Sequence, residues 1–127
     1  MPVLVQIALG GALGALLRFA VVSRLAVIWP GAFPVGVLTV NVLGSFAMGL
    51  IVAVATARSG GMLASALPFL TIGLMGGFTT FSAFSLDTLR LIEEGETASA
   101  MAYVAGSVAF SVFGLWLGLT LGRSFAP

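Results

Sequence analysis

Apolar residues along this chain form four long runs, separated by short polar or proline-containing connections. The runs cover residues 3–28, 35–57, 67–92 and 98–121. A helix needs about 20 predominantly apolar residues to cross a bilayer, and each run reaches that length. The pattern predicts an all-α integral membrane protein with four transmembrane helices, folded as a single domain over residues 1–127.

The prolines support this segmentation, because each lies at the edge of an apolar run, where a missing N–H costs little. The connections at residues 29–34, 58–66 and 93–97 are short. They predict that consecutive helices run antiparallel as close neighbours. The first run lacks a basic leader and a convincing cleavage site, so we expect a spanning helix and not a secretory signal.

Composition supports the membrane assignment and limits the kinds of reaction and partner that we expect. The chain is 60% hydrophobic and 7% charged, with a mean hydropathy of +1.21, which is typical of a protein surrounded by lipid. It contains no Cys and no His, the residues that most often supply nucleophiles, general bases and metal ligands, so we do not expect an enzyme. A net charge of +1 gives no basic patch, and we expect no nucleic-acid partner.

Small residues recur every four positions in three of the runs. The stripes are Gly10 and Gly14 in the first run, Ser45, Gly49 and Ala53 in the second, and Gly114, Gly118 and Gly122 in the fourth. Such stripes let the backbones of two membrane helices approach closely. We predict that they are packing seams.

The third run carries two adjacent glycines, Gly76 and Gly77, followed by the hydroxyl-rich stretch 78–85, at about mid-bilayer depth. One interpretation is a break in the helix, which lipid does not tolerate unless protein, water or an ion satisfies the freed peptide groups. The other is an unbroken helix whose Ser and Thr side chains bond back to preceding carbonyls. The pattern alone leaves both open.

Three further side chains within the runs suit an anion, each with an alternative. Phe81 and Phe84 are three positions apart and share a helix face, where ring edges attract an anion or the rings simply pack. Asn41 offers two amide donors, either to an anion or to a neighbouring helix. Ionisable residues within spans are functional candidates by default.

The fourth run presents a hydroxyl ladder of Tyr103, Ser107 and Ser111, which interhelical hydrogen bonding explains equally well. Arg18 either stabilises an anion at a vestibule or bonds carbonyls at a helix end. Asp87 precedes Arg90 by three positions, which favours a local ion pair. The remaining acidic residues, Glu93, Glu94 and Glu96, are expected to be solvated loop charges.

Three segments together resemble the Fluc family of fluoride channels, also called CrcB. They are GGFTTFSAFS at 76–85, GGALGALLR at 10–18 and NVLGSF at 41–46. The resemblance implies passive, fluoride-selective export across the cytoplasmic (inner) membrane. It also implies an antiparallel dual-topology homodimer with two pores, surrounded by membrane lipid.

Residue roles follow from the same resemblance. It implies that Asn41 is a pore donor and that the edges of Phe81 and Phe84 line the path. Tyr103, Ser107 and Ser111 would form a polar track. The main-chain carbonyls of Gly76 and Thr79 from two subunits would hold a structural sodium ion. The chain departs from the family pattern at Val37 and Ala83, where Thr is common, and at Asp87, where Glu is usual.

Two rival functions stay open on the residues. A small four-helix drug exporter needs a titratable carboxylate in its binding site, and the first two runs contain neither Asp nor Glu. A non-transporting scaffold subunit would use Asn41 and the two phenylalanines for packing only.

The arginines predict an undecided orientation. If the helices alternate, Arg58 and Arg123 lie near one side of the membrane and Arg24 and Arg90 near the other, so the positive-inside rule has little to act on. We expect single cysteines introduced at residues 31 and 60 each to be labelled by a membrane-impermeant reagent from both sides. Labelling of each position from one side only would contradict dual topology.

Overall fold

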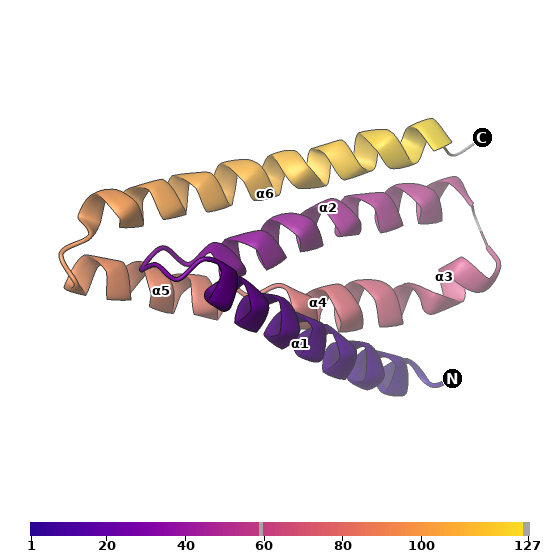
Figure 1. Cartoon of the computed structure of the whole chain (residues 1–127). Helices are drawn as coiled ribbons and strands as arrows, with labels where there is room; N and C mark the ends of the chain where they lie inside the picture. Colours follow the sequence, from indigo (N-terminus) through magenta and orange to yellow (C-terminus); the bar gives the residue numbers. More distant parts are fainter. Residues whose placement is uncertain (59, 126–127) are drawn as a thin grey trace.

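The computed structural model describes residues 1–58 and 60–125, and within these residues all regular structure is helical (Figure 1). The elements are α1 (Val3–Ile28), α2 (Val35–Ala57), α3 (Met62–Leu67), η1 (Pro68–Met75), α4 (Gly76–Phe78), α5 (Phe81–Glu93) and α6 (Thr97–Phe125). Four stretches of the described chain are long and apolar enough to cross a membrane, with α3 to α5 counting as one stretch over residues 62–93. The prediction of four spanning helices is confirmed.

The first two predicted runs coincide with α1 and α2, and the other two are longer in the structure. The third begins at Met62, after Gly61 has turned the chain with a φ of 84°. The fourth continues to Phe125, because helical hydrogen bonding extends beyond the apolar residues and the Ser124 hydroxyl donates back to the Thr120 carbonyl. The boundary at residue 67 was therefore too late, and the boundary at residue 121 too early.

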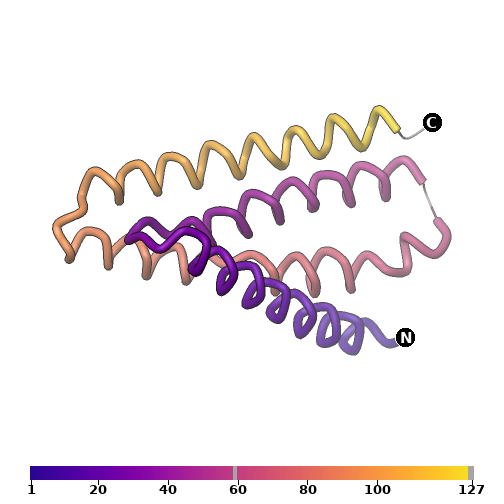
Figure 2. The backbone as a smooth tube through the Cα atoms, viewed as in Figure 1, coloured from indigo at the N-terminus to yellow at the C-terminus, as the bar shows by residue number. Residues whose placement is uncertain are grey.

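Consecutive helices alternate in direction, but they are not the pairs that pack most closely. The backbone trace shows α1 beside the η1–α4 segment and α2 beside α6, with the two termini at the same end (Figure 2). Both pairs are parallel, because each joins helices two places apart in the chain. The prediction that consecutive helices run antiparallel as close neighbours is confirmed, but the larger contact areas join helices two places apart, since short connections fix direction and leave contact area to the helix surfaces.

Glycines determine which helix surfaces meet, and the predicted seams are confirmed at their glycines. A Cβ added at Gly10 or Gly14 would lie within 2.4 Å or 2.2 Å of a carbonyl oxygen of η1. At the second seam, a Cβ at Gly49 would lie 2.3 Å from the carbonyl oxygen of Leu115, and one at Gly118 would lie 2.2 Å from that of Phe46. Both contacts are backbone to backbone, as small-residue stripes permit.

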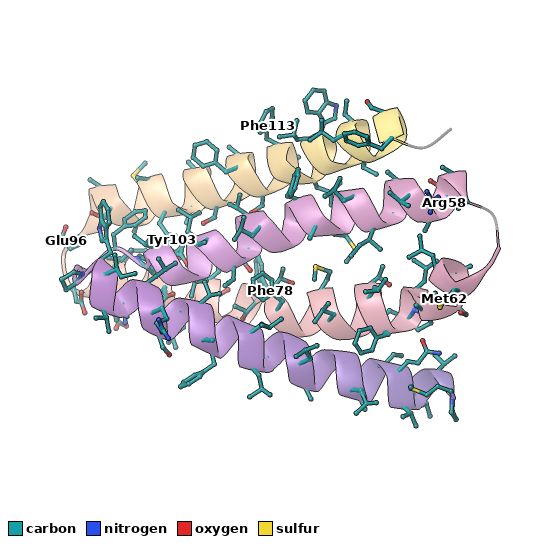
Figure 3. The ribbon with its side chains drawn as sticks, turned by 45° about the vertical axis from the view of Figure 1, so that its right-hand side comes forward. Arg58, Met62, Phe78, Glu96, Tyr103 and Phe113 are labelled. Atoms are coloured by element: carbon teal, nitrogen blue, oxygen red, sulfur yellow. The ribbon has the colours of Figure 1, made fainter. Side chains whose placement is uncertain are left out.

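The chain buries few side chains completely, and four of those that are buried form one cluster at one end. Val37, Leu91, Ala100 and Tyr103 form a cluster near the α1–α2 connection and the turn between α5 and α6. Large apolar side chains are exposed along α1 and α6, among them Leu4, Leu16, Phe19, Val27, Met101, Phe110 and Phe113, the last pointing outward (Figure 3). An apolar exterior over a small core is what lipid-facing helices require.

The α2–α6 seam gives a direct stability prediction. We expect Gly118→Ala to lower the thermal unfolding midpoint in detergent, because its methyl group meets the Phe46 backbone, and overpacking costs about 1–3 kcal/mol. Gly106→Ala on the same helix is the control, since its Cβ would meet nothing nearer than the Phe110 ring at 3.7 Å. The unfolding of both variants can be followed by tryptophan fluorescence. Equal unfolding midpoints for the two variants would contradict close packing at the seam.

Candidate functional site

The predicted polar residues converge on one cavity of about 410 Å³ between α2, the 75–84 segment and α6. Five of the seven predicted pathway residues line it: Asn41, Phe81, Phe84, Ser107 and Ser111. The rest of the lining is mostly apolar and comes from Gly44, Ser45, Met48, Met75, Thr79, Thr80, Val108, Val112 and Leu115. Asp, Glu, Lys, Arg and His do not occur among these lining residues.

Two extended residues lie between α4 and α5, next to this cavity. Thr79 has φ −86° and ψ 160°, and Thr80 has φ −155° and ψ 119°. Thr80 is also the N-cap of α5, where its Oγ1 accepts a hydrogen bond from the Ala83 N–H at 3.2 Å. Threonine is a preferred N-cap residue, because its hydroxyl accepts from the N–H three positions later, here that of Ala83. This preference could have located the start of α5 from sequence.

Asn41 pairs with the backbone of Thr80 through two hydrogen bonds. The Thr80 N–H donates to Oδ1 of Asn41 at 2.8 Å, and Nδ2 of Asn41 donates to the Thr80 carbonyl at 3.0 Å. In a continuous helix that N–H would donate to the carbonyl of Gly76. Asn41 was expected to donate either to an anion or to a neighbouring helix. The bond to Thr80 uses one N–H of the amide, and the second N–H has no part in this pairing.

Aromatic rings form a chain from the cavity to the α1–α2 connection. The centroids of Phe81 and Phe84 lie 5.4 Å apart, so the two rings share a face as predicted. Phe84 meets Tyr103 edge to face at 5.2 Å and 82°, and Tyr103 meets Phe33 at 5.6 Å. Phe33 was not predicted from the sequence as a site residue, because an aromatic residue beside a proline in a connection gives no periodic signal.

The α6 hydroxyls lie on one face, as the predicted ladder requires. Tyr103 is fully buried, and its hydroxyl lies 3.5 Å from Oδ2 of Asp87. Ser107 is 94% buried, and its Oγ has no hydrogen-bond partner among the residues that the structure describes. A buried hydroxyl without a partner is costly, and Ser107 is one of the residues that line the cavity.

Two arginines lie outside the cavity lining. Nη1 of Arg18 donates to the Thr79 carbonyl at 3.0 Å, so Arg18 bonds a carbonyl of the extended segment. Nη2 of Arg90 lies 3.3 Å from Oδ1 of Asp87, which confirms the predicted local ion pair. Asp87 and Arg90 line a second cavity, of about 290 Å³, together with the α1–α2 connection from Trp29 to Pro34 and the first residues of α2.

Two of the three positions at which the resemblance implied a departure, Val37 and Ala83, lie close to Tyr103. Val37 belongs to the buried cluster that contains Tyr103, and Ala83 packs against that cluster. Neither side chain lines the 410 Å³ cavity. Apolar residues at these two positions are therefore consistent with packing around the tyrosine ring.

Comparison with known proteins gives one consistent result. The family model described as "CrcB-like protein, Camphor Resistance (CrcB)" matches residues 5–119. The chain is 52% identical over 118 residues to the fluoride-specific ion channel FluC of Paracoccus denitrificans, covering 93% of this chain and 92% of the relative. It is 50% identical over 126 residues to the FluC of Roseobacter denitrificans, covering 97% of each chain.

Proposed function

This chain belongs to the CrcB family, and from that membership and the cavity geometry we propose that it is a fluoride channel that conducts the ion passively. The single observation that carries the proposal is the convergence of Asn41, Ser107 and the paired phenylalanines on one cavity with no charged lining residue. The matched relatives are named ion channels, which are not enzymes.

Fluoride is small and strongly hydrated, so a pore must replace its water with closely spaced donors. The free N–H of Asn41, the partnerless Ser107 hydroxyl and the Ser111 hydroxyl supply such donors, and the ring edges of Phe81 and Phe84 add weak positive potential. All of these groups are neutral. Neutral donors favour conduction, because an ion held by a buried cation would leave slowly.

Tyr103 and Arg18 have roles at either side of the cavity in this proposal. Tyr103 contacts Phe84 and also lies beside Phe33 of the second cavity, so it continues the path of Phe84, Ser107 and Ser111 toward Asp87. Arg18 holds the Thr79 carbonyl, and its charge lies close enough to the extended segment to attract an anion toward it.

We propose that the working unit is an antiparallel homodimer in the cytoplasmic (inner) membrane, with a break in the third span of each subunit. Phe81 lines the cavity yet is 78% exposed in the single chain, so one chain leaves the path open on a side. Gly76 is also exposed, and its carbonyl has lost the Thr80 N–H to Asn41. Lipid offers no donor to such a carbonyl, which favours cover by a second copy.

The same carbonyls fit the proposed structural sodium ion. Gly76 has a carbonyl without its helical donor, and the Thr79 carbonyl, which accepts from Arg18, keeps a second lone pair. Carbonyl oxygens are suitable ligands for an alkali cation, and two copies would supply four of them. When bound, the ion would offset the negative ends of these carbonyl dipoles at the subunit contact.

The rival functions are not favoured. A proton-coupled drug exporter requires a titratable carboxylate in its binding site, and the cavity lining contains none. A scaffold subunit has no use for a buried hydroxyl without a partner, such as that of Ser107.

Fluoride efflux from liposomes, read with a fluoride electrode, tests the proposed path. We expect purified wild-type protein to release fluoride, and Asn41→Ala or Phe81→Ile to lower the rate at least about fivefold while the dimer persists, because each removes an interaction of about 1 kcal/mol or more. Phe113→Ile is the matched control, since Phe113 faces outward on α6 and does not line the cavity (Figure 3). Near-normal fluoride efflux in both test variants would contradict the proposed path.

Ser107 separates a transport role from a structural one. We expect Ser107→Ala to keep or raise the thermal unfolding midpoint, because it removes a buried polar atom without a partner, and yet to slow fluoride efflux several-fold. Ser124→Ala on the same helix is the control, since its exposed hydroxyl bonds to the Thr120 carbonyl. A lower midpoint with unchanged efflux would assign the Ser107 hydroxyl to stability instead.

A further inference from the structure

The backbone conformation of Thr80 is unusual for the interior of a membrane span. With φ −155° and ψ 119°, its N–H and C=O point to the same side, as they do for a residue in a β-strand. A donor and an acceptor are therefore presented side by side toward α2. The carboxamide of Asn41 carries the complementary acceptor and donor, and both hydrogen bonds form, at 2.8 Å and 3.0 Å.

This pairing allows only one orientation of the Asn41 amide. Rotation of the amide by 180° would bring the NH₂ group against the Thr80 N–H and the amide oxygen against the Thr80 carbonyl. Both contacts would then join like groups. The Oδ1 atom is thus committed to the Thr80 N–H, and the nitrogen keeps one N–H that Thr80 does not use.

The orientation matters because Asn41 lines the cavity. An amide that turns freely presents its oxygen, which repels an anion, as readily as its nitrogen, which attracts one. We infer that the Thr80 peptide group is a positioning group that locks the Asn41 amide so that the site offers a donor to the ion. The inference deepens the proposed fluoride function and rests on it.

The segment that carries this peptide group is itself held at several points. The Thr79 N–H donates to the Met75 carbonyl at 3.0 Å, Arg18 holds the Thr79 carbonyl, and the Thr80 hydroxyl caps α5 through Ala83. Hydrogen bonds on both flanks keep Thr80 extended. The positioning group therefore does not depend on Asn41 alone for its conformation.

An amide-to-ester substitution removes the Thr80 N–H without changing any side chain, and it also makes the Thr79 carbonyl a weaker acceptor from Arg18. The α-hydroxy analogue of threonine at position 80 removes the donor to Oδ1 and leaves the Thr80 carbonyl in place. We expect this variant to lower fluoride efflux about tenfold, the effect of losing one oriented hydrogen bond of ~1.4 kcal/mol. The matched control is the same analogue at position 120, an exposed threonine of α6 that does not line the cavity, and its rate should stay within about threefold.

A double-mutant cycle distinguishes positioning from general damage. If the Thr80 N–H acts through Asn41, Asn41→Ala lowers efflux much less in the ester background than in the wild-type background. Equal effects in the two backgrounds, or normal efflux from the position-80 ester, would overturn the inference. Wild-type protein that releases no fluoride would instead overturn the proposed function.

Amide hydrogen exchange gives a second readout that needs no ester. The Thr80 N–H should be protected in the wild-type protein, and Asn41→Ala should speed its exchange at least about tenfold while the Thr79 N–H is unchanged. Rapid exchange at Thr80 in the wild-type protein would overturn the inference, even if the ester variant failed to fold.

Discussion

A hydrocarbon solvent offers no hydrogen-bond partner to a peptide group, so each N–H and C=O that leaves a helix within a span must find a partner in the protein or on an ion. This constraint governs the centre of the chain. Thr79 and Thr80 leave the helical conformation there, and their groups bond to Arg18 of α1 and Asn41 of α2. The two most conspicuous polar side chains of the first two helices thus stabilise the interruption in the third.

The glycine seams explain why these partners are within reach. Gly10 and Gly14 bring α1 against the η1–α4 backbone, so that Arg18, one turn further along, reaches Thr79. Gly49 and Gly118 bring α2 against α6. Asn41, nearer the N-terminal end of α2, and Ser107 of α6 both line the cavity next to this seam. The close backbone contacts therefore define both the support of the extended segment and the two walls of the cavity.

Sequence reasoning succeeded where a single helix carries the signal, but it did not identify which helices pack together or which groups bond between them. Apolar length located α1 and α2, and three-residue spacing placed Phe81 beside Phe84. It could not show that α2 packs on α6, because connection length says nothing of contact area. Nor could it assign the Asn41 amide to Thr80, since the two residues are 39 positions apart and meet only through the fold.

The position of charge in the structure completes the physical account of an anion path. Arg18 and the Asp87–Arg90 pair stay outside the lining, while the uncharged residues Asn41, Ser107, Phe81 and Phe84 line the cavity. A guanidinium in contact with fluoride would hold it by a strong Coulomb attraction, which grows as the surrounding dielectric constant falls. From a position outside the lining, the guanidinium charge still lowers the energy of an anion in the cavity without becoming its ligand. The arrangement therefore favours entry of the ion while leaving each binding step weak enough to reverse.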